Sequence, residues 1–305
     1  MEKGSAYGSQ QTDRQTFALM GVVAGLLVWV SFGLDWNNII HTSAESFNDS
    51  WANPTVVLLW RIACAGAGIG AVVSMFRIGA GTMQVLMHEE RAMKMLAPVG
   101  REKFVTFSSW TLISNILYFL SAGAASFLAI IGIEVPLWIE ALQTVMFAIA
   151  CGSAFLTAAV VRHVILPELF ESDRNSDFIF KYHEQMMHNF SAIFLAVEMV
   201  LVVPTLQPEL SLVCVGMGLF YVFFAYVNAY HGSGFYVYSF IDPRRRYAPV
   251  VMMALAAAIA VFYVCMYVVS LIAAANLLLA ALILTAWVSS IVQFSPTREP
   301  DQSSS

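Results

Sequence analysis

Charged residues and cysteines are scarce in this sequence. Only 11% of its 305 residues are Asp, Glu, Lys or Arg, whereas 59% are hydrophobic. Soluble domains have about 25% charged residues, so the composition excludes an ordinary soluble enzyme and indicates a membrane protein. The four cysteines lie singly in four different apolar segments, which gives no disulfide or metal-binding spacing. They are Cys64, Cys151, Cys214 and Cys265, which we interpret as small packing residues.

Several binding motifs are missing as well. The sequence has no glycine-rich phosphate loop and no basic amphipathic arm of the kind that binds nucleic acid. We therefore expect no nucleic-acid partner, no cofactor and no bound metal. The sequence does not indicate a protein partner.

Long apolar runs, by contrast, are abundant. A transmembrane helix needs roughly 20 apolar residues. One very long run, Ala248–Phe294, is sufficient for two helices with a break near Ser270–Asn276. The other runs are Phe17–Leu34, Thr55–Phe76, Phe104–Ile131, Leu137–Val161, Met187–Pro204 and Ser211–Tyr230. The sequence therefore predicts an all-α, polytopic membrane helix bundle with about eight transmembrane helices.

Positive charges occupy alternate gaps between these runs. Fourteen of the 15 Lys and Arg residues follow this rule. They are Lys3 and Arg14, then Arg77, Arg91, Lys94, Arg101 and Lys103, then Arg162, Arg174 and Lys181, then Arg244, Arg245 and Arg246, and finally Arg298. The gaps between these groups contain none: Asp35–Pro54, Gly132–Pro136, Thr205–Leu210 and the break near Ala273. Because cytoplasmic loops are enriched in Lys and Arg, both termini are predicted to be cytoplasmic.

The remaining cation, Arg61, lies inside the second apolar run. Two interpretations are open. Its side chain could extend along the helix to the outer interface. Alternatively, it could be the buried partner of an acidic residue, namely Glu134, Glu140 or Glu198.

The chain divides into four parts by composition. Residues 1–16 are a cytoplasmic tail, 17–103 are two transmembrane helices with a cytoplasmic loop, 104–294 are a six-helix membrane domain, and 295–305 are a short polar tail that we expect to be disordered. The first apolar run has no clear small-residue cleavage site, so we interpret it as a retained span. The protein is expected to be multi-pass, in an endomembrane or the plasma membrane.

Polar residues gather at the predicted cytoplasmic ends of the spans. Four of the six histidines lie there, as do four hydroxyl residues that open the third helix. They are His163, His183, His188 and His231, and Thr106, Ser108, Ser109 and Thr111. Each histidine could simply be an interfacial residue with an apolar body and a wet tip.

His188 has a second polar residue further along the same helix. Glu198 lies ten positions on, near the middle of the bilayer, where a carboxyl group is costly unless it is protonated, paired or facing a cavity. Ten residues separate the two side chains by about 15 Å along the helix, so they cannot touch. Ser191 lies between them. This arrangement predicts a polar pocket, which would suit either catalysis or an ion path.

Three local sequences resemble the family of androgen-induced and androgen-dependent TFPI-regulating membrane proteins. Residues 187–199 read MHNFSAIFLAVEM, and the family has a His at the start of a helix with a Glu ten residues later. Residues 103–107 read KFVTF, similar to the family's Lys-Phe-Leu-Thr-Phe. Residues 234–240 read GFYVYSF, similar to Gly-x-Trp-Val-Tyr-Pro-Phe. The resemblance covers about residues 101–240 and excludes the first two spans.

The resemblance implies an integral-membrane hydrolase of lipid esters, with fatty-acid esters of hydroxy fatty acids as the family's substrates. Thr106 would be the nucleophile and His188 the base, since a Thr hydroxyl reacts only when a base removes its proton. Asn189, Ser109 and helix N-terminal amides are candidate oxyanion donors. Glu198, Ser191 and His231 are further candidates for the pocket.

Two other classes of function remain possible from the sequence. A transporter or ion channel would use Glu198, Arg61 and the histidines to line a route across the membrane. A non-enzymatic membrane scaffold would use the loop Arg77–Lys103 to bind a partner. Catalysis requires the Thr106 hydroxyl and the His188 ring to lie within hydrogen-bond reach or one water beyond it.

Overall fold

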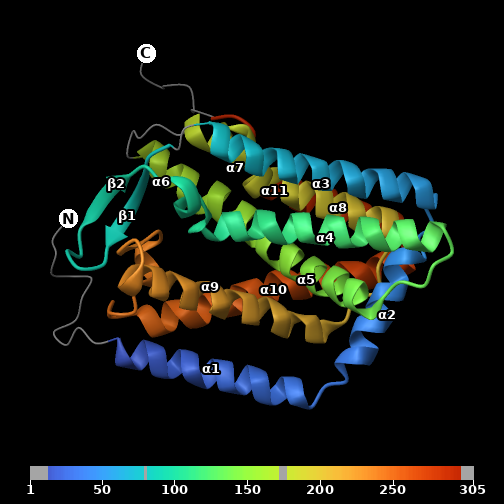
Figure 1. The fold of residues 1–305 in the computed structure, drawn as a ribbon, viewed down its shortest axis with the longest axis horizontal. Coiled ribbons are helices and arrows are strands. Elements are labelled where there is room, and N and C mark those ends of the chain that lie inside the picture. The colour runs from blue at the N-terminus through green and yellow to red at the C-terminus, as the bar shows by residue number, and fades with distance from the viewer. Residues whose placement is uncertain (1–12, 79–80, 172–176, 297–305) are drawn as a thin grey trace, which may run out of the picture.

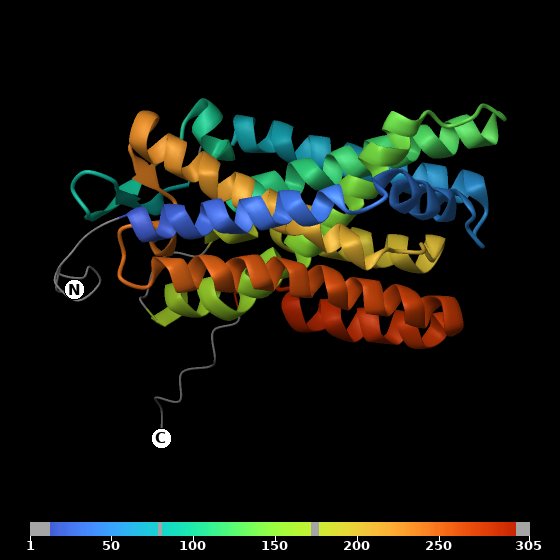
Figure 2. The same ribbon diagram turned by 90° about the horizontal axis from the view of Figure 1, so that it is seen from below.

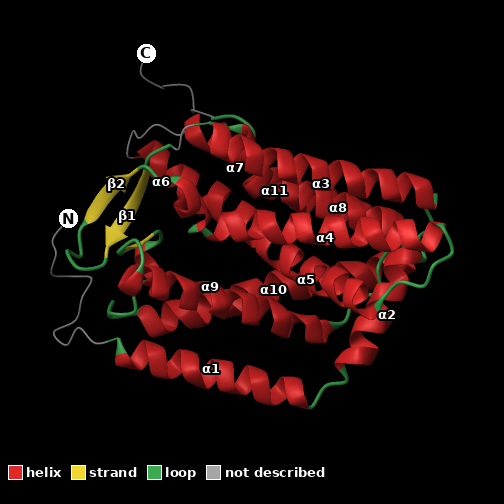
Figure 3. Ribbon diagram, in the orientation of Figure 1, coloured by secondary structure: helices red, strands yellow, loops and turns green. Residues whose placement is uncertain are grey.

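The computed structural model describes residues 13–78, 81–171 and 177–296. Lys3, Arg174 and Arg298 lie outside these residues, as does most of the two predicted tails, 1–16 and 295–305. The described chain is an all-α bundle whose long helices run side by side along the longest axis of the molecule (Figures 1 and 2). Its few strands lie together at one end (Figure 3). The predicted fold class is confirmed.

Seven helices in the described residues are long and apolar enough to cross a membrane. Three of these spans continue through short turns or π-helical segments into neighbouring elements. Four spans are single helices: α1 (Arg14–Phe32), α3 (Pro54–Arg77), α4 (Phe107–Ile130) and α10 (Ala248–Ala275). The fourth span is α5 (Leu137–Val160), which continues to Phe170 through a π turn (Val161–Ile165) and α6 (Leu166–Glu171). The fifth consists of α7 (Tyr182–Gln185), a π turn (Met186–Phe190) and α8 (Ser191–Val202), and the sixth is the turn Pro208–Leu210 followed by α9 (Ser211–His231). The chain is therefore a multi-pass membrane protein.

The long apolar run at the carboxyl end is divided at Asn276, within the predicted break. The Asn276 side chain accepts a hydrogen bond from the amide of Leu279 at 3.0 Å and so caps α11 (Leu277–Ile291). This eighth helix has 15 residues and is shorter than the other spans. It runs back alongside the later part of α10 (Figure 2), and near its end the carbonyl oxygen of Ser290 lies 3.0 Å from the His163 ring.

Two segments that the sequence predicted as loops have regular structure. The outer gap Asp35–Pro54 contains α2 (Trp36–Asn48), whose first turn is capped by Asp35. The cytoplasmic loop Arg77–Lys103 contains the hairpin β1 (Met83–Met87) and β2 (Met93–Leu96), and β3 (Phe235–Tyr236) pairs antiparallel with the other edge of β1. A short 3-10 turn (Gly100–Phe104) then leads into α4.

Small residues bring α5 into the centre of the bundle. It is the most deeply buried span, with a buried face that includes Ala150, Cys151 and Ala154. A Cβ atom on Gly152 would lie 3.2 Å from the carbonyl oxygen of Ile259 in α10, so only glycine permits this approach without movement. At the other extreme, α1 lies along the edge of the bundle (Figure 1), with only Thr16 buried.

Candidate functional site

Thr106 is the N-cap residue of α4. Its hydroxyl oxygen accepts a hydrogen bond from the Ser109 amide at 3.2 Å and from the Ser108 hydroxyl at 3.2 Å. Both donors belong to the first turn of the helix, where unpaired amides create a partial positive charge. The Thr106 oxygen therefore lies where developing negative charge is stabilised.

The proton of the Thr106 hydroxyl has a defined direction. The hydroxyl oxygens of Thr106 and Ser109 are 2.7 Å apart. Ser109 has a single hydroxyl proton and donates it to the carbonyl oxygen of Lys103 at 2.8 Å. Thr106 must then be the donor in the pair, so its proton points towards Ser109.

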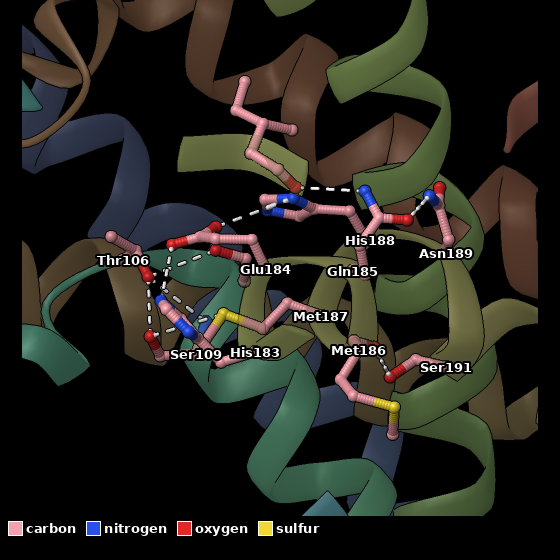
Figure 4. Close-up of polar contacts among 12 residues, drawn as sticks. Thr106, Ser109, His183, Glu184, Gln185, Met186, Met187, His188, Asn189 and Ser191 are labelled. Atoms are coloured by element: carbon pink, nitrogen blue, oxygen red, sulfur yellow. Dashed lines mark hydrogen bonds and ion pairs between the residues drawn. The ribbon is translucent and has the colours of Figure 1, made fainter. Parts of the chain in front are cut away.

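The second part of the site lies on the span that contains α7 and α8. Three ionisable side chains meet there, as Figure 4 shows. One carboxylate oxygen of Glu184 lies 3.6 Å from Nε2 of His183, and the other lies 3.7 Å from Nδ1 of His188. Both imidazoles are buried, with side chains 10% and 9% exposed.

A π turn at Met186–Phe190 explains why both histidines flank one carboxylate. Side chains five positions apart on an α-helix diverge by roughly 140°. The π turn replaces an i→i+4 bond with an i→i+5 bond, here from the Ser191 amide to the Met186 carbonyl, and brings such residues towards one face. His183 and His188 are five positions apart. Single π turns occur frequently at functional sites.

One contact joins the α4 end of the site to the π turn, and another joins it to the loop after α9. The Ser109 hydroxyl lies 4.0 Å from the sulfur of Met187, the residue next to His188. Tyr238, in the loop after α9, accepts a hydrogen bond from the Phe107 amide at 3.3 Å. Burial raises the pKa of the Tyr238 hydroxyl to about 12, to which the negative charge of Glu184 contributes. In the described chain, however, no hydrogen bond joins Thr106 directly to His188.

Asn189 and Ser191 have structural partners instead of facing Thr106. The Asn189 amide group donates to the Gln185 side chain at 2.7 Å and to the Gln293 carbonyl at 2.6 Å, which ties the π turn to the chain after α11. The Ser191 hydroxyl donates to the Met186 carbonyl at 2.7 Å. Asn189 is thus already occupied as a donor, and the Ser109 hydroxyl donates its proton to the Lys103 carbonyl. Of the predicted oxyanion donors, the amides at the start of α4 remain.

Glu198 lies deeper in the bundle, where it binds Arg61. Both side chains are 0% exposed, and the carboxylate accepts from Nε and Nη2 of Arg61 at 2.8 Å each. The Tyr118 hydroxyl donates to the same carboxylate oxygen at 2.8 Å. Of the two interpretations of Arg61, the buried pair with Glu198 is therefore correct. The predicted pocket linking Glu198 to His188 is replaced by this closed ionic contact.

The other histidines at this end of the bundle lie apart from the cluster. His163 is in the π turn Val161–Ile165, and its Nε2 atom lies 3.0 Å from the Ser290 carbonyl oxygen. His231 is exposed at the end of α9. Thr111 donates a hydrogen bond to the Phe107 carbonyl of its own helix at 3.2 Å.

Sequence reasoning missed two residues of the site, Glu184 and Tyr238. Glu184 precedes His188 by four positions, the spacing of neighbours on a helix, so this signal was present in the sequence. Tyr238 lies in the segment 234–240, for which the sequence indicated a family resemblance but no role in the site. Its approach to α4 depends on the tertiary fold.

A groove of ≈350 Å³ occurs elsewhere, between α1 and α9. Its lining is mostly apolar and includes Leu27, Trp36, Gly216 and Phe220. In the described part of the chain, no group of three or more His, Cys, Asp or Glu side chains is arranged to hold a metal ion. Neither a family model nor a curated protein nor a solved structure matches this chain.

Proposed function

We propose that this protein is an integral-membrane hydrolase of lipid esters, with Thr106 as the nucleophile and His188 as the base. One observation carries the proposal. A hydroxyl at a helix N-terminus and a buried imidazole facing a carboxylate lie at the same end of the bundle, joined through the Ser109–Met187 contact. The resemblance of residues 101–240 to a family of threonine hydrolases supports the same assignment.

The chemistry divides ester cleavage into two steps. The Thr106 oxygen attacks the ester carbonyl carbon while His188 accepts the hydroxyl proton. The C–O bond of the ester breaks, His188 returns the proton to the leaving alcohol, and the acyl group stays on Thr106. Water then attacks the acyl group with His188 again as base, which releases the acid and restores Thr106.

Binding of the ester must bring the two catalytic groups into contact, either directly or through one water. Catalytic hydrogen bonds are often long in unliganded enzymes and tighten when substrate binds. The first turn of α4 supplies positive potential for the tetrahedral oxyanion. The amides of this turn are the candidate oxyanion donors beside Thr106.

The location of the site suits an amphiphilic ester. Thr106 caps the predicted cytoplasmic end of a membrane span, so a bound ester group would meet water while its acyl chains lie among the helices. The resemblance favours fatty-acid esters of hydroxy fatty acids as the substrates.

Covalent labelling tests the assignment directly. Purified full-length protein is treated with a fluorophosphonate probe, and the modified residue is located by mass spectrometry. We expect the adduct on Thr106, and we expect Thr106→Ala and His188→Ala each to reduce labelling by at least about 100-fold.

Two matched variants serve as controls. Thr111→Ala removes another hydroxyl near the start of α4, and His163→Ala removes the histidine of the π turn Val161–Ile165. Both should label like the wild type. Undiminished labelling of Thr106→Ala or His188→Ala would refute the proposed mechanism.

The transporter alternative receives less support. Arg61 and Glu198, which would line its route, bind each other in a closed part of the core. No contact in the described chain favours a scaffold function over hydrolysis.

A further inference from the structure

Glu184 is placed between two imidazole rings at the proposed active site (Figure 4). Its two carboxylate oxygens face different rings, one towards Nε2 of His183 at 3.6 Å and the other towards Nδ1 of His188 at 3.7 Å. Its side chain is 24% exposed. A carboxylate in this position can accept a hydrogen bond from an N–H group of each ring.

The nitrogen that faces Glu184 determines which nitrogen of His188 can act as a base. Nδ1 of His188 is buried and has no hydrogen-bond partner closer than Glu184. A buried nitrogen beside a carboxylate is stabilised when it carries the proton. Nε2 of the same ring then keeps the lone pair, as a general base requires.

We propose that Glu184 is the positioning residue of a Thr106–His188–Glu184 triad. This inference rests on the function proposed above and adds a third residue to its site. Glu184 fixes the Nδ1–H tautomer and the orientation of His188, and its negative charge stabilises the imidazolium that forms when Thr106 is deprotonated. Protons move only between Thr106, His188, the alcohol and water.

The helix geometry supports the assignment independently of the distances. Glu184 precedes His188 by four residues, so both project from one face of the span, immediately before and within the π turn. The other carboxylate oxygen lies 3.6 Å from Nε2 of His183, so each oxygen of Glu184 faces an imidazole.

The experiment measures hydrolysis of p-nitrophenyl octanoate and fluorophosphonate labelling by full-length wild type, Glu184→Gln and Glu184→Asp. We expect Glu184→Gln to lower kcat and the labelling rate by about 10²- to 10⁴-fold while KM changes less than about threefold. Glu184→Asp keeps the charge and should recover at least about tenfold of the lost kcat. A matched control is Glu45→Gln, because Glu45 also pairs with a histidine four residues away, His41, but at an exposed site.

Each outcome decides the question. A Glu184→Gln variant within threefold of wild-type kcat overturns the triad, and so does equal impairment of the Gln and Asp variants, which is expected of a structural role. A thermal unfolding curve for each variant identifies loss of fold. If wild type labels on Thr106 but Glu184 is dispensable, only the triad fails. If wild type neither labels nor hydrolyses, the proposed function fails with it.

Discussion

Arg61 is the residue with the most complete set of partners in the bundle. Besides Glu198, its guanidinium donates to the Ala122 carbonyl at 3.1 Å, the Ser126 hydroxyl at 2.5 Å and the Phe47 carbonyl at 3.0 Å. These partners belong to α2, α4 and α8, so one side chain of α3 connects four helices. A buried charge is tolerated only when it is paired and hydrogen-bonded in this way.

Removal of one partner should therefore cost more than removal of both. Arg61→Leu leaves Glu198 buried without its cation, and we expect the free energy of unfolding to fall by about 3–5 kcal/mol. In the double variant Arg61→Leu, Glu198→Leu, no charge remains unpaired, so much of the loss should be recovered. Denaturant titration in detergent micelles measures both variants, with Arg246→Leu, at an exposed position, as the control. A double variant less stable than Arg61→Leu would contradict this account.

At the residue scale, the sequence predicted the common location of Thr106 and His188 but not their connections. Positive-inside reasoning places both residues at one end of the bundle, and the structure brings their helices together through Ser109 and Met187. Asn189 was predicted to face the reaction, yet it binds Gln185 and the Gln293 carbonyl. The direction of the Asn189 side chain depends on the π turn. A helical wheel with 3.6 residues per turn assumes a regular α-helix, so it does not predict this direction.

At the scale of elements, the hairpin β1–β2 is held to the bundle through β3. The His88 amide donates to the Gly234 carbonyl at 2.8 Å, and the Tyr236 hydroxyl lies 3.3 Å from Nδ1 of His88. The His88 ring also packs on Tyr230, with centroids 4.2 Å apart. His88 is therefore one of the side chains through which the hairpin contacts the end of α9 and the loop after it.

The hairpin should loosen in acid. Burial, and next the charge of Arg244, lowers the pKa of His88 below its ordinary value, so the folded protein favours the neutral ring. A lowered pKa gives stability that is present above the unfolded value of about 6.5 and is lost as the pH falls through the lower folded value. The amide hydrogen exchange rates of residues 83–87 and 235–236, corrected for intrinsic exchange rates, should therefore increase when the pH is lowered from 7.5 to 5.

A non-titrating residue provides the control for this effect. His88→Asn should remove the pH dependence, whereas His41→Gln, at an exposed position in α2, should leave it unchanged. Equal pH dependence in His88→Asn would show that another group is responsible.

Apolar run length predicted the long helices well and the short elements poorly. The limits of α3 and α5 differ from the expected runs by one residue at each affected end. In contrast, α2 has a mixed sequence with few long apolar residues in succession, and its packing against the interior is made by single side chains such as Phe47. The hairpin strands are shorter still, and their pairing with β3 joins segments that are far apart in the sequence. The periodicity of a single segment does not predict contacts between distant segments.

At the scale of the whole molecule, the distribution of charge and the fold agree on which segments share an end. The N-terminal end of α4 and the π turn Met186–Phe190 lie at the end where the described Lys and Arg loops gather. The short α11 does not run the full length of the bundle (Figure 2).

The orientation of the bundle can be measured by cysteine accessibility. Glu134→Cys and Glu90→Cys place an exposed thiol at opposite ends. In sealed vesicles of known orientation, a membrane-impermeant maleimide should reach residue 90 only from the cytoplasmic side and residue 134 only from the other side. Labelling of both from one side would contradict the bundle, and a reversed pattern would contradict only the predicted orientation.

The Arg61–Glu198 contact also has a consequence for biogenesis. The two residues are 137 positions apart, so α3 is synthesised well before α8. Until α8 is available, a guanidinium in α3 costs about 2.5–3.5 kcal/mol on insertion into the bilayer, reduced only by the oxygens of Phe47, Ala122 and Ser126. The amino-terminal helices of the nascent chain thus remain incomplete in the translocon until a carboxylate from the second half of the protein arrives.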